Sequence, residues 1–167
     1  MDLLWAPWRL SYVTTNKPGG DAPCFICRGL AGNDDRANLV VWRTPLSVAI
    51  VNRFPYNNGH LLISPKAHKA RLEELTAEEL LDGMETLRTL IRALDGLMQP
   101  HGYNVGLNLG TAAGAGVPGH LHWHLVPRWN GDTNFMPVLA DTRVIVQSLE
   151  TLYDLLAEAI RKDLQSR

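Results

Sequence analysis

The sequence predicts an α+β fold, in which an antiparallel β-sheet packs against a long helix and a C-terminal helix. Three observations lead to this prediction. Short runs of β-branched and aliphatic residues are common in the first half of the chain. Two longer stretches place apolar residues at helical spacing, and turn-forming residues separate these segments. Strands that precede a long helix, without a regular strand–helix alternation, favour an α+β over an α/β arrangement.

The predicted strands are short apolar segments bounded by turn signals. The first two flank Thr44-Pro45 and are expected to form a hairpin. The third is entered through the turn-rich residues 55–59, and the last follows a glycine-rich loop at 114–119. The five predicted strands are residues 38–43, 46–52, 60–64, 103–111 and 120–127.

Two helices are predicted from apolar spacing. Thr76 and Glu79 form a capping box at the start of the first, and Pro100 and Gly102 end it. Its expected core stripe is Leu80, Met84, Leu87, Ile91, Leu94 and Met98. The second helix is expected from about Val144 onward, with an apolar stripe of Leu149, Leu152, Leu156, Ile160 and Leu164.

The composition is that of an ordinary globular domain. The chain has 167 residues, of which 46% are hydrophobic and 20% charged, enough for one core without disulfide staples. We therefore expect a single domain over residues 1–167, with residues 1–23 as an N-terminal arm and loop. The formal net charge of −1 lacks the basic excess that a nucleic-acid partner would require.

The chain carries no membrane or export signal that composition can detect. No apolar run approaches the length of about 18 residues that spans a bilayer. The first ten residues contain two tryptophans and a proline, and they do not form a basic segment followed by an apolar one. These features exclude a membrane partner and lead us to expect a cytoplasmic protein.

Three histidines alternate with apolar residues in the last predicted strand. Side chains of successive strand residues point to opposite faces, so His120, His122 and His124 are expected to share one face. Three imidazoles side by side suit a core poorly, because each ring nitrogen needs a partner when buried. They suit a row of nucleophile, proton donor and phosphate or metal contact. An exposed polar face is the plainer alternative, and the apolar residues opposite argue against it.

A glycine-rich segment, residues 110–119, directly precedes the histidines. Its small residues would let the backbone approach a ligand, and its N–H groups could contact phosphate oxygens. It lacks the Gly-Lys-Ser/Thr ending of a P-loop. A plain turn is the alternative interpretation, but the position before three histidines favours a phosphate-contacting loop.

The histidine motif followed by two apolar residues resembles the signature of the histidine triad (HIT) superfamily. Segments 50–55, 58–65 and 103–108 are similar to the family in order and spacing. Segments 4–9 and 127–135 resemble a narrower bacterial branch of the family, which includes a diadenosine tetraphosphate phosphorylase. The resemblance implies a HIT-like antiparallel sheet with a long and a C-terminal helix. It also implies a homodimer.

The resemblance implies roles for individual residues. His122 corresponds to the nucleophile, and His124 to its phosphate-contacting partner in catalysis. Gly116 stands where Fhit-like and Hint-like members usually have a phosphate-contacting glutamine, and the phosphorylase branch also has a small residue there. The expected nucleotide-binding residues are Asn52, at the ribose hydroxyls, with Asn108, Gly114, Gly116 and His124.

Two cysteines, Cys24 and Cys27, are spaced as C-x-x-C. This spacing alone leaves redox, metal-binding and inert core roles open. Some bacterial HIT proteins that this chain resembles bind zinc with such a pair, a later histidine and the first triad histidine. The resemblance therefore implies a structural zinc ion held by Cys24, Cys27, His68 and His120, which is a closed tetrahedral ligand set.

The expected activity is cleavage of a nucleotide phosphoanhydride bond. A neutral imidazole is nucleophilic near pH 7, and the phosphoramidate that it forms can be opened by water, phosphate or another acceptor. We expect a HIT enzyme that cleaves dinucleoside polyphosphates by phosphorolysis or hydrolysis through nucleotidyl-His122. The alternatives are a Hint-like adenosine phosphoramidase and a nucleotide-binding regulator with slow turnover. The intact triad argues against the regulator, since binding alone does not need His122.

Overall fold

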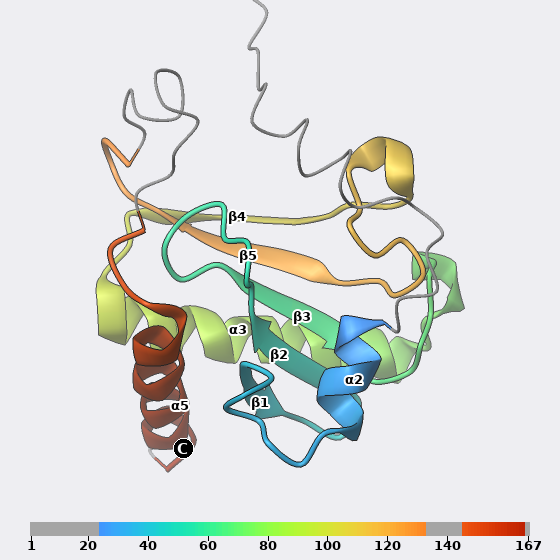
Figure 1. Ribbon diagram of the computed structural model, residues 1–167, viewed down its shortest axis with the longest axis horizontal. Helices are drawn as coiled ribbons and strands as arrows, with labels where there is room; N and C mark the ends of the chain where they lie inside the picture. The colour runs from blue at the N-terminus through green and yellow to red at the C-terminus, as the bar shows by residue number, and fades with distance from the viewer. Residues whose placement is uncertain (1–23, 133–144, 166–167) are drawn as a thin grey trace, which may run out of the picture.

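A five-stranded antiparallel sheet forms the centre of the computed structural model, which describes residues 24–132 and 145–165 (Figure 1). The strands are ordered β1-β2-β3-β5-β4, so the last strand in the sequence lies between β3 and β4. All four neighbouring pairs are antiparallel. The strands are β1 (Val40–Arg43), β2 (Ser47–Val51), β3 (Leu61–Pro65), β4 (Gly102–Leu107) and β5 (Trp123–Arg128).

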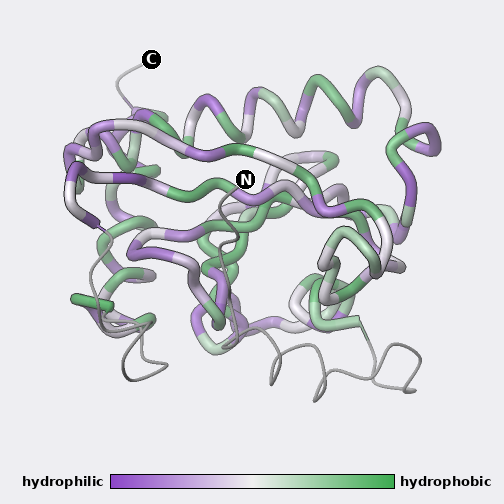
Figure 2. The backbone as a smooth tube through the Cα atoms, turned by 90° about the horizontal axis from the view of Figure 1, so that it is seen from above, coloured by the Kyte–Doolittle hydropathy of each residue, from purple (hydrophilic) through white to green (hydrophobic). Residues whose placement is uncertain are grey.

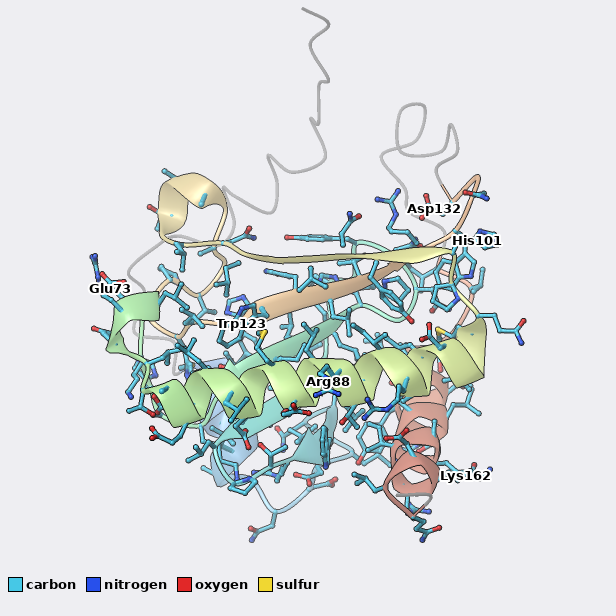
Figure 3. The ribbon with its side chains drawn as sticks, turned by 180° about the vertical axis from the view of Figure 1, so that it is seen from behind. Glu73, Arg88, His101, Trp123, Asp132 and Lys162 are labelled. Atoms are coloured by element: carbon cyan, nitrogen blue, oxygen red, sulfur yellow. The ribbon has the colours of Figure 1, made fainter. Side chains whose placement is uncertain are left out.

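The helices lie on both sides of this sheet. The long helix α3 (Ala77–Met98) crosses one face and contacts β2 and β3, while α5 (Leu149–Gln165) packs against α3 and β1. The short helix α2 (Phe25–Ala31) lies toward the opposite face (Figures 1 and 3). Two 3₁₀ turns, η1 (Leu72–Glu74) and η2 (Thr111–Ala113), lie in the connections. The predicted α+β class and both predicted helices are confirmed, and α2 is too short to show a helical period.

The start of α3 forms as its sequence predicts. The hydroxyl of Thr76 accepts a hydrogen bond from the Glu79 N–H at 3.2 Å, and the Glu79 carboxylate accepts one from the Thr76 N–H at 2.7 Å. The same carboxylate accepts a charge-assisted bond from Lys69 Nζ at 2.6 Å. The capping box therefore also fixes the chain that follows His68 to the helix N-terminus.

The predicted core stripe of α3 is confirmed in part, because Leu94 is buried and Leu80, Leu87, Ile91 and Met98 pack against the core. Met84 is exposed, and several of the other predicted residues are only half-buried. The long helix in Figure 2 alternates between hydrophilic and hydrophobic residues along its length. A side chain at Gly83 would lie 3.5 Å from the ring of Trp123, which lies between the sheet and α3 in Figure 3. Gly83 therefore faces the sheet at the point where the large Trp123 side chain fills the space between the strand and the helix. The buried positions are Glu79, Gly83, Thr86, Thr89, Leu90, Ala93 and Leu94.

Three predicted boundaries also differ from the structure. Strand β5 begins at Trp123 instead of residue 120, because His120 and His122 precede the paired region. Strand β4 ends at Leu107 and not at residue 111, where η2 begins. Helix α5 begins at Leu149, since Ser148 caps it by accepting a bond from the Thr151 N–H. The predicted N-terminal arm lies outside the described residues.

Gly59 precedes the buried His60, in a backbone conformation that only glycine adopts easily. Its φ is +77°, and a Cβ there would lie 3.0 Å from both Met98 Sδ and Pro127 Cγ. We expect Gly59→Ala to lower the free energy of unfolding by about 1–3 kcal/mol, through strain and overpacking. Gly96→Ala is the matched control, because its Cβ would meet nothing within 4 Å and alanine favours the helix. Urea unfolding of both variants measures the difference, and equal stability of Gly59→Ala and wild type would contradict this reading.

Across the described parts of the chain, none of the helices combines the length and the apolar composition needed to cross a membrane.

Candidate active site and metal site

Two cysteines and two histidines from three separate segments meet beside the sheet. Cys24 and Cys27 lie at the start of α2, His68 follows β3, and His120 precedes β5. Their ligand atoms all lie within 4.8 Å of one another. The Sγ atom of Cys27 is 3.1 Å from His68 Nδ1 and 3.5 Å from His120 Nδ1, and the Sγ atom of Cys24 is 3.3 Å from His120 Nδ1. The structure thus brings together the four residues predicted as metal ligands.

The chemistry of these four groups fits a metal ion. The Nε2 atom of His120 lies 2.9 Å from the Pro65 carbonyl and donates its proton there, so Nδ1 carries a lone pair toward the sulfur atoms. Nitrogen and sulfur ligands of one tetrahedral zinc ion would be about 3.6 Å apart. Burial and the neighbouring sulfur of Cys24 raise the pKa of the Cys27 thiol. A bound cation would offset this and hold both sulfurs as thiolates.

His122 follows this cluster and is nearly buried. Its Nδ1 lies 2.8 Å from the carbonyl oxygen of His120, so the ring donates from Nδ1 and keeps its lone pair on Nε2. The ring of Phe25, the first residue of α2, packs edge-on against it at a centroid distance of 6.5 Å. Burial lowers the pKa of His122, with the hydrogen bond to His120 opposing the shift. His120 therefore orients the His122 ring through its backbone carbonyl.

His124 belongs to a second group, which includes a residue that sequence reasoning did not place in the site. The rings of His122 and His124 are neighbours, 5.1 Å apart. His60, which is fully buried, has its Nδ1 2.9 Å from the N–H of Tyr56 and its Nε2 2.9 Å from Nδ1 of His124. His60 therefore contacts both the preceding turn and the third triad histidine. The sequence marks His60 only as a histidine after Gly59 at the start of a strand. This local pattern does not reveal that His60 contacts His124, 64 residues away.

The backbone bond to His60 determines where the protons lie. Because the N–H of Tyr56 donates to Nδ1 of His60, this nitrogen is unprotonated and the proton is on Nε2. His60 Nε2 then donates to Nδ1 of His124. The proton of neutral His124 is consequently on Nε2, directed away from His60.

Two of the predicted nucleotide-binding residues flank the His60–His124 pair: Asn52 lies beside His60, and Asn108 lies beside His124. Asn52 directs Nδ2 to His60 Nδ1 at 3.2 Å, while its Oδ1 accepts a bond from the Phe54 N–H. Nδ2 of Asn108 lies 3.4 Å from His124 Nε2, and a half-turn of this amide would present its oxygen to the N–H instead. Two more of the predicted residues, Gly114 and Gly116, lie in the loop between η2 and His120, with Gly114 in the left-handed region at φ 85°.

Comparison with known proteins identifies similar chains. The sequence matches the HIT domain over residues 34–131. It is 40% identical to an AP-4-A phosphorylase from Mycobacterium tuberculosis over 159 residues, 92% of this chain and 82% of that protein. It is 37% identical to a bis(5'-nucleosyl)-tetraphosphatase (asymmetrical) from Schizosaccharomyces pombe, over 56% of this chain and 50% of that protein. A crystal structure of a Zn-bound histidine triad family protein from Mycobacterium smegmatis has a TM-score of 0.70 and 25% identity, covering 89% of this chain and 100% of that one.

The sheet, the histidine row and these similarities define an α+β protein of the histidine triad class. Because the match covers more than half of the residues, the chain belongs to the HIT domain family. The resemblance predicted from the histidine motif is confirmed.

Proposed function

We propose that this protein cleaves dinucleoside polyphosphates of the diadenosine tetraphosphate type, through a nucleotidyl intermediate on His122. The observation that carries the proposal is the bond from His122 Nδ1 to the His120 carbonyl, because it leaves the lone pair on Nε2. The similarity to an AP-4-A phosphorylase and to a bis(5'-nucleosyl)-tetraphosphatase supports this substrate class.

The proposed reaction has two displacements at one phosphorus atom. First, Nε2 of His122 forms a bond to the α-phosphorus, and the bond to the bridging oxygen breaks, so the rest of the substrate leaves as a nucleoside polyphosphate. Second, phosphate or water attacks the same phosphorus, the P–N bond breaks, and its electron pair returns to Nε2. A water molecule loses its proton to solvent in this step. Phosphate yields a nucleoside diphosphate, and water yields a nucleoside monophosphate.

The neighbouring groups would stabilise the phosphate during both steps. His124 is proposed as the second catalytic histidine, since its Nε2–H can donate to a phosphate oxygen as negative charge develops. Asn108 lies beside the same nitrogen, and the backbone N–H groups of Gly114 and Gly116 are proposed to contact the phosphates. Donors held in place before the reaction supply most of such stabilisation.

Asn52 is proposed to bind the ribose hydroxyls. Its amide keeps one N–H and one oxygen lone pair after its bonds to His60 and Phe54. Replacing it by alanine should raise KM by about tenfold, since a hydrogen-bonded hydroxyl pair would be lost. Steady-state kinetics and a nucleotide-bound structure test this role together. An unchanged KM, with the ribose beyond hydrogen-bond reach of Asn52, would contradict it.

The metal held by Cys24, Cys27, His68 and His120 is proposed to be structural zinc. Two thiolates and two imidazoles are the ligands that zinc prefers, and a family member from Mycobacterium smegmatis has been crystallised bound to zinc. Zinc would join α2, the chain after β3 and the segment that carries His122. With four protein ligands it would have no open position for water, so it takes no part in the chemical step.

The assembly and compartment are also proposed. Strand β4 forms an edge of the sheet, and Val105 on it is exposed. A second copy could pair there across a two-fold axis, which supports a homodimer. Two thiols that serve as metal ligands suit a reducing compartment such as the cytoplasm.

Incubation with diadenosine tetraphosphate, with and without phosphate, tests the proposed activity. Formation of ADP and ATP would indicate phosphorolysis, whereas AMP and ATP would indicate hydrolysis. An adenosine phosphoramidate is assayed in parallel, because preferential cleavage of that compound would favour a phosphoramidase. No product from any of these compounds would contradict the proposal and favour a nucleotide-binding regulator.

A further inference from the structure

Tyr56, in the loop between β2 and β3, packs its ring against two histidines of the site. Its ring stacks on His124 with centroids 5.5 Å apart and planes 13° from parallel, and it contacts His60 at 4.6 Å. The residue is 42% exposed. An aromatic residue in an exposed loop would gain little from this position as core packing, so its contact with His124 calls for another explanation.

The backbone of the same residue reaches the same histidine. Its N–H donates to Nδ1 of His60, and this bond determines that His60 donates to His124. The ring of Tyr56 therefore fixes the plane of the His124 imidazole, while its N–H fixes the nitrogen that bears the His124 proton. One loop residue controls both the orientation and the tautomer of His124.

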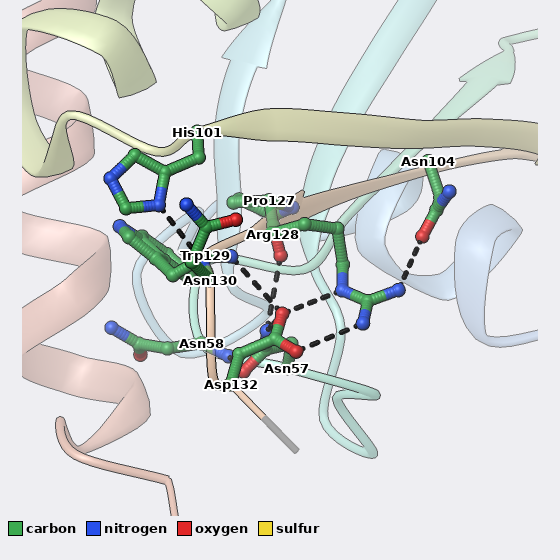
Figure 4. A network of polar contacts seen from close by, with 9 residues as sticks. All are labelled: Asn57, Asn58, His101, Asn104, Pro127, Arg128, Trp129, Asn130 and Asp132. Carbon is green, nitrogen blue, oxygen red and sulfur yellow. Dashed lines mark hydrogen bonds and ion pairs between the residues drawn. The ribbon is translucent and has the colours of Figure 1, made fainter.

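The loop that carries Tyr56 is anchored firmly enough for this role. Its next residue, Asn57, donates from Nδ2 to Asp132 at 2.9 Å and to the Pro127 carbonyl at 3.2 Å. Asp132 also forms a two-bond ion pair with Arg128, at 2.6 and 2.9 Å (Figure 4). Because Pro127 and Arg128 belong to β5, the loop is tied to the strand that bears His124. These contacts restrict the movement of Tyr56 relative to His124.

We propose that Tyr56 is a positioning residue, which holds His124 with its Nε2–H directed at the substrate phosphate. The catalytic part of this inference rests on the proposed function, but the positioning of His124 does not. A donor held in one orientation stabilises developing charge without reorganising during the reaction. Loss of the ring would let the imidazole rotate, and the donor would reach the phosphate in only part of the population.

Two variants separate the contribution of the ring from that of the hydroxyl. We expect Tyr56→Phe, which keeps the ring and the N–H, to retain the wild-type kcat to within about twofold, and Tyr56→Val to lower kcat by about tenfold with little change in KM. Tyr153→Val, on the distant helix α5, is the control for loss of a half-buried tyrosine and should leave kcat unchanged. An unchanged kcat in Tyr56→Val, or an equal loss in Tyr56→Phe, would overturn the proposal.

A spectroscopic measurement tests the same proposal without substrate. Long-range ¹H–¹⁵N correlation spectra of the labelled protein distinguish protonated from unprotonated imidazole nitrogens. We expect His124 to carry its proton on Nε2 in the wild type and in both variants, because all three keep the backbone N–H of residue 56. We expect the His124 signals to broaden only in Tyr56→Val, where the imidazole has lost the ring that holds its plane. A proton on Nδ1 in the wild type, or identical spectra for all variants, would overturn the proposal. If the wild type cleaves no dinucleotide, the proposed function fails while these spectra still decide the positioning role.

Discussion

Replacing His122 by asparagine is expected to reduce turnover of diadenosine tetraphosphate by at least about a thousandfold, as loss of a nucleophile does in other covalent enzymes. Asparagine can still donate to the His120 carbonyl that holds Nδ1 of His122, but it offers no nucleophilic nitrogen. Nucleotide affinity should stay within about tenfold of wild type, because the binding groups are unchanged. Single-turnover kinetics and calorimetry of nucleotide binding separate the two effects.

The control for this substitution is a histidine outside the site. His101 is exposed in the loop before β4, where its Nδ1 accepts a bond from the Asn130 N–H. His101→Asn should therefore leave turnover unchanged. If His122→Asn also kept near-normal rates, the covalent mechanism would be wrong, and direct attack by water or phosphate would have to replace it.

Removing one ligand of the proposed zinc site should have the largest effect on stability. Cys27 lies within 3.5 Å of both histidine nitrogens of the set, so Cys27→Ser should lower the bound zinc from about one ion per chain to nearly none. Loss of a structural metal is among the largest single destabilisations, and for a chain of this length the melting temperature should fall by about 10 °C. Elemental analysis and thermal unfolding measure the two changes.

The order of events distinguishes a structural from a catalytic metal. A chelator should lower the melting temperature of the wild type before it lowers the rate of the chemical step, and the His101→Asn variant should respond as the wild type does. Wild-type protein that gains no thermal stability on loading with zinc would show that the four ligands serve another purpose.

The parts of the fold that follow local rules could be predicted from the sequence. The capping box of Thr76 and Glu79 marks the start of α3 because both of its bonds form within one turn. The position of the most deeply buried small residues of α3 could not be predicted in the same way. It depends on the Trp123 ring, which packs near Gly83, and hydropathy does not show where a large strand residue meets a small helical one.

The site residues that belong to a recognisable sequence motif could be predicted from the sequence. The row of three histidines follows from their alternation with apolar residues, and the four proposed metal ligands follow from the family resemblance. The structure brings these four residues together. The contribution of Tyr56 and His60 depends on the pairing of β3 with β5, where Leu62 lies opposite His124. No spacing along the chain reveals this contact, because it joins residues more than 60 positions apart through the register of the sheet.

The most direct test of the central claim is to trap the covalent intermediate. The enzyme is mixed with diadenosine tetraphosphate without phosphate, quenched at alkaline pH, where a phosphoramidate survives, and digested for tandem mass spectrometry. If His122 is the nucleophile, the peptide that contains residues 120–128 should carry one adenylyl group, located on His122 and absent from His122→Asn. An adenylyl group on another residue, or cleavage without an adduct under conditions that preserve phosphoramidates, would contradict it.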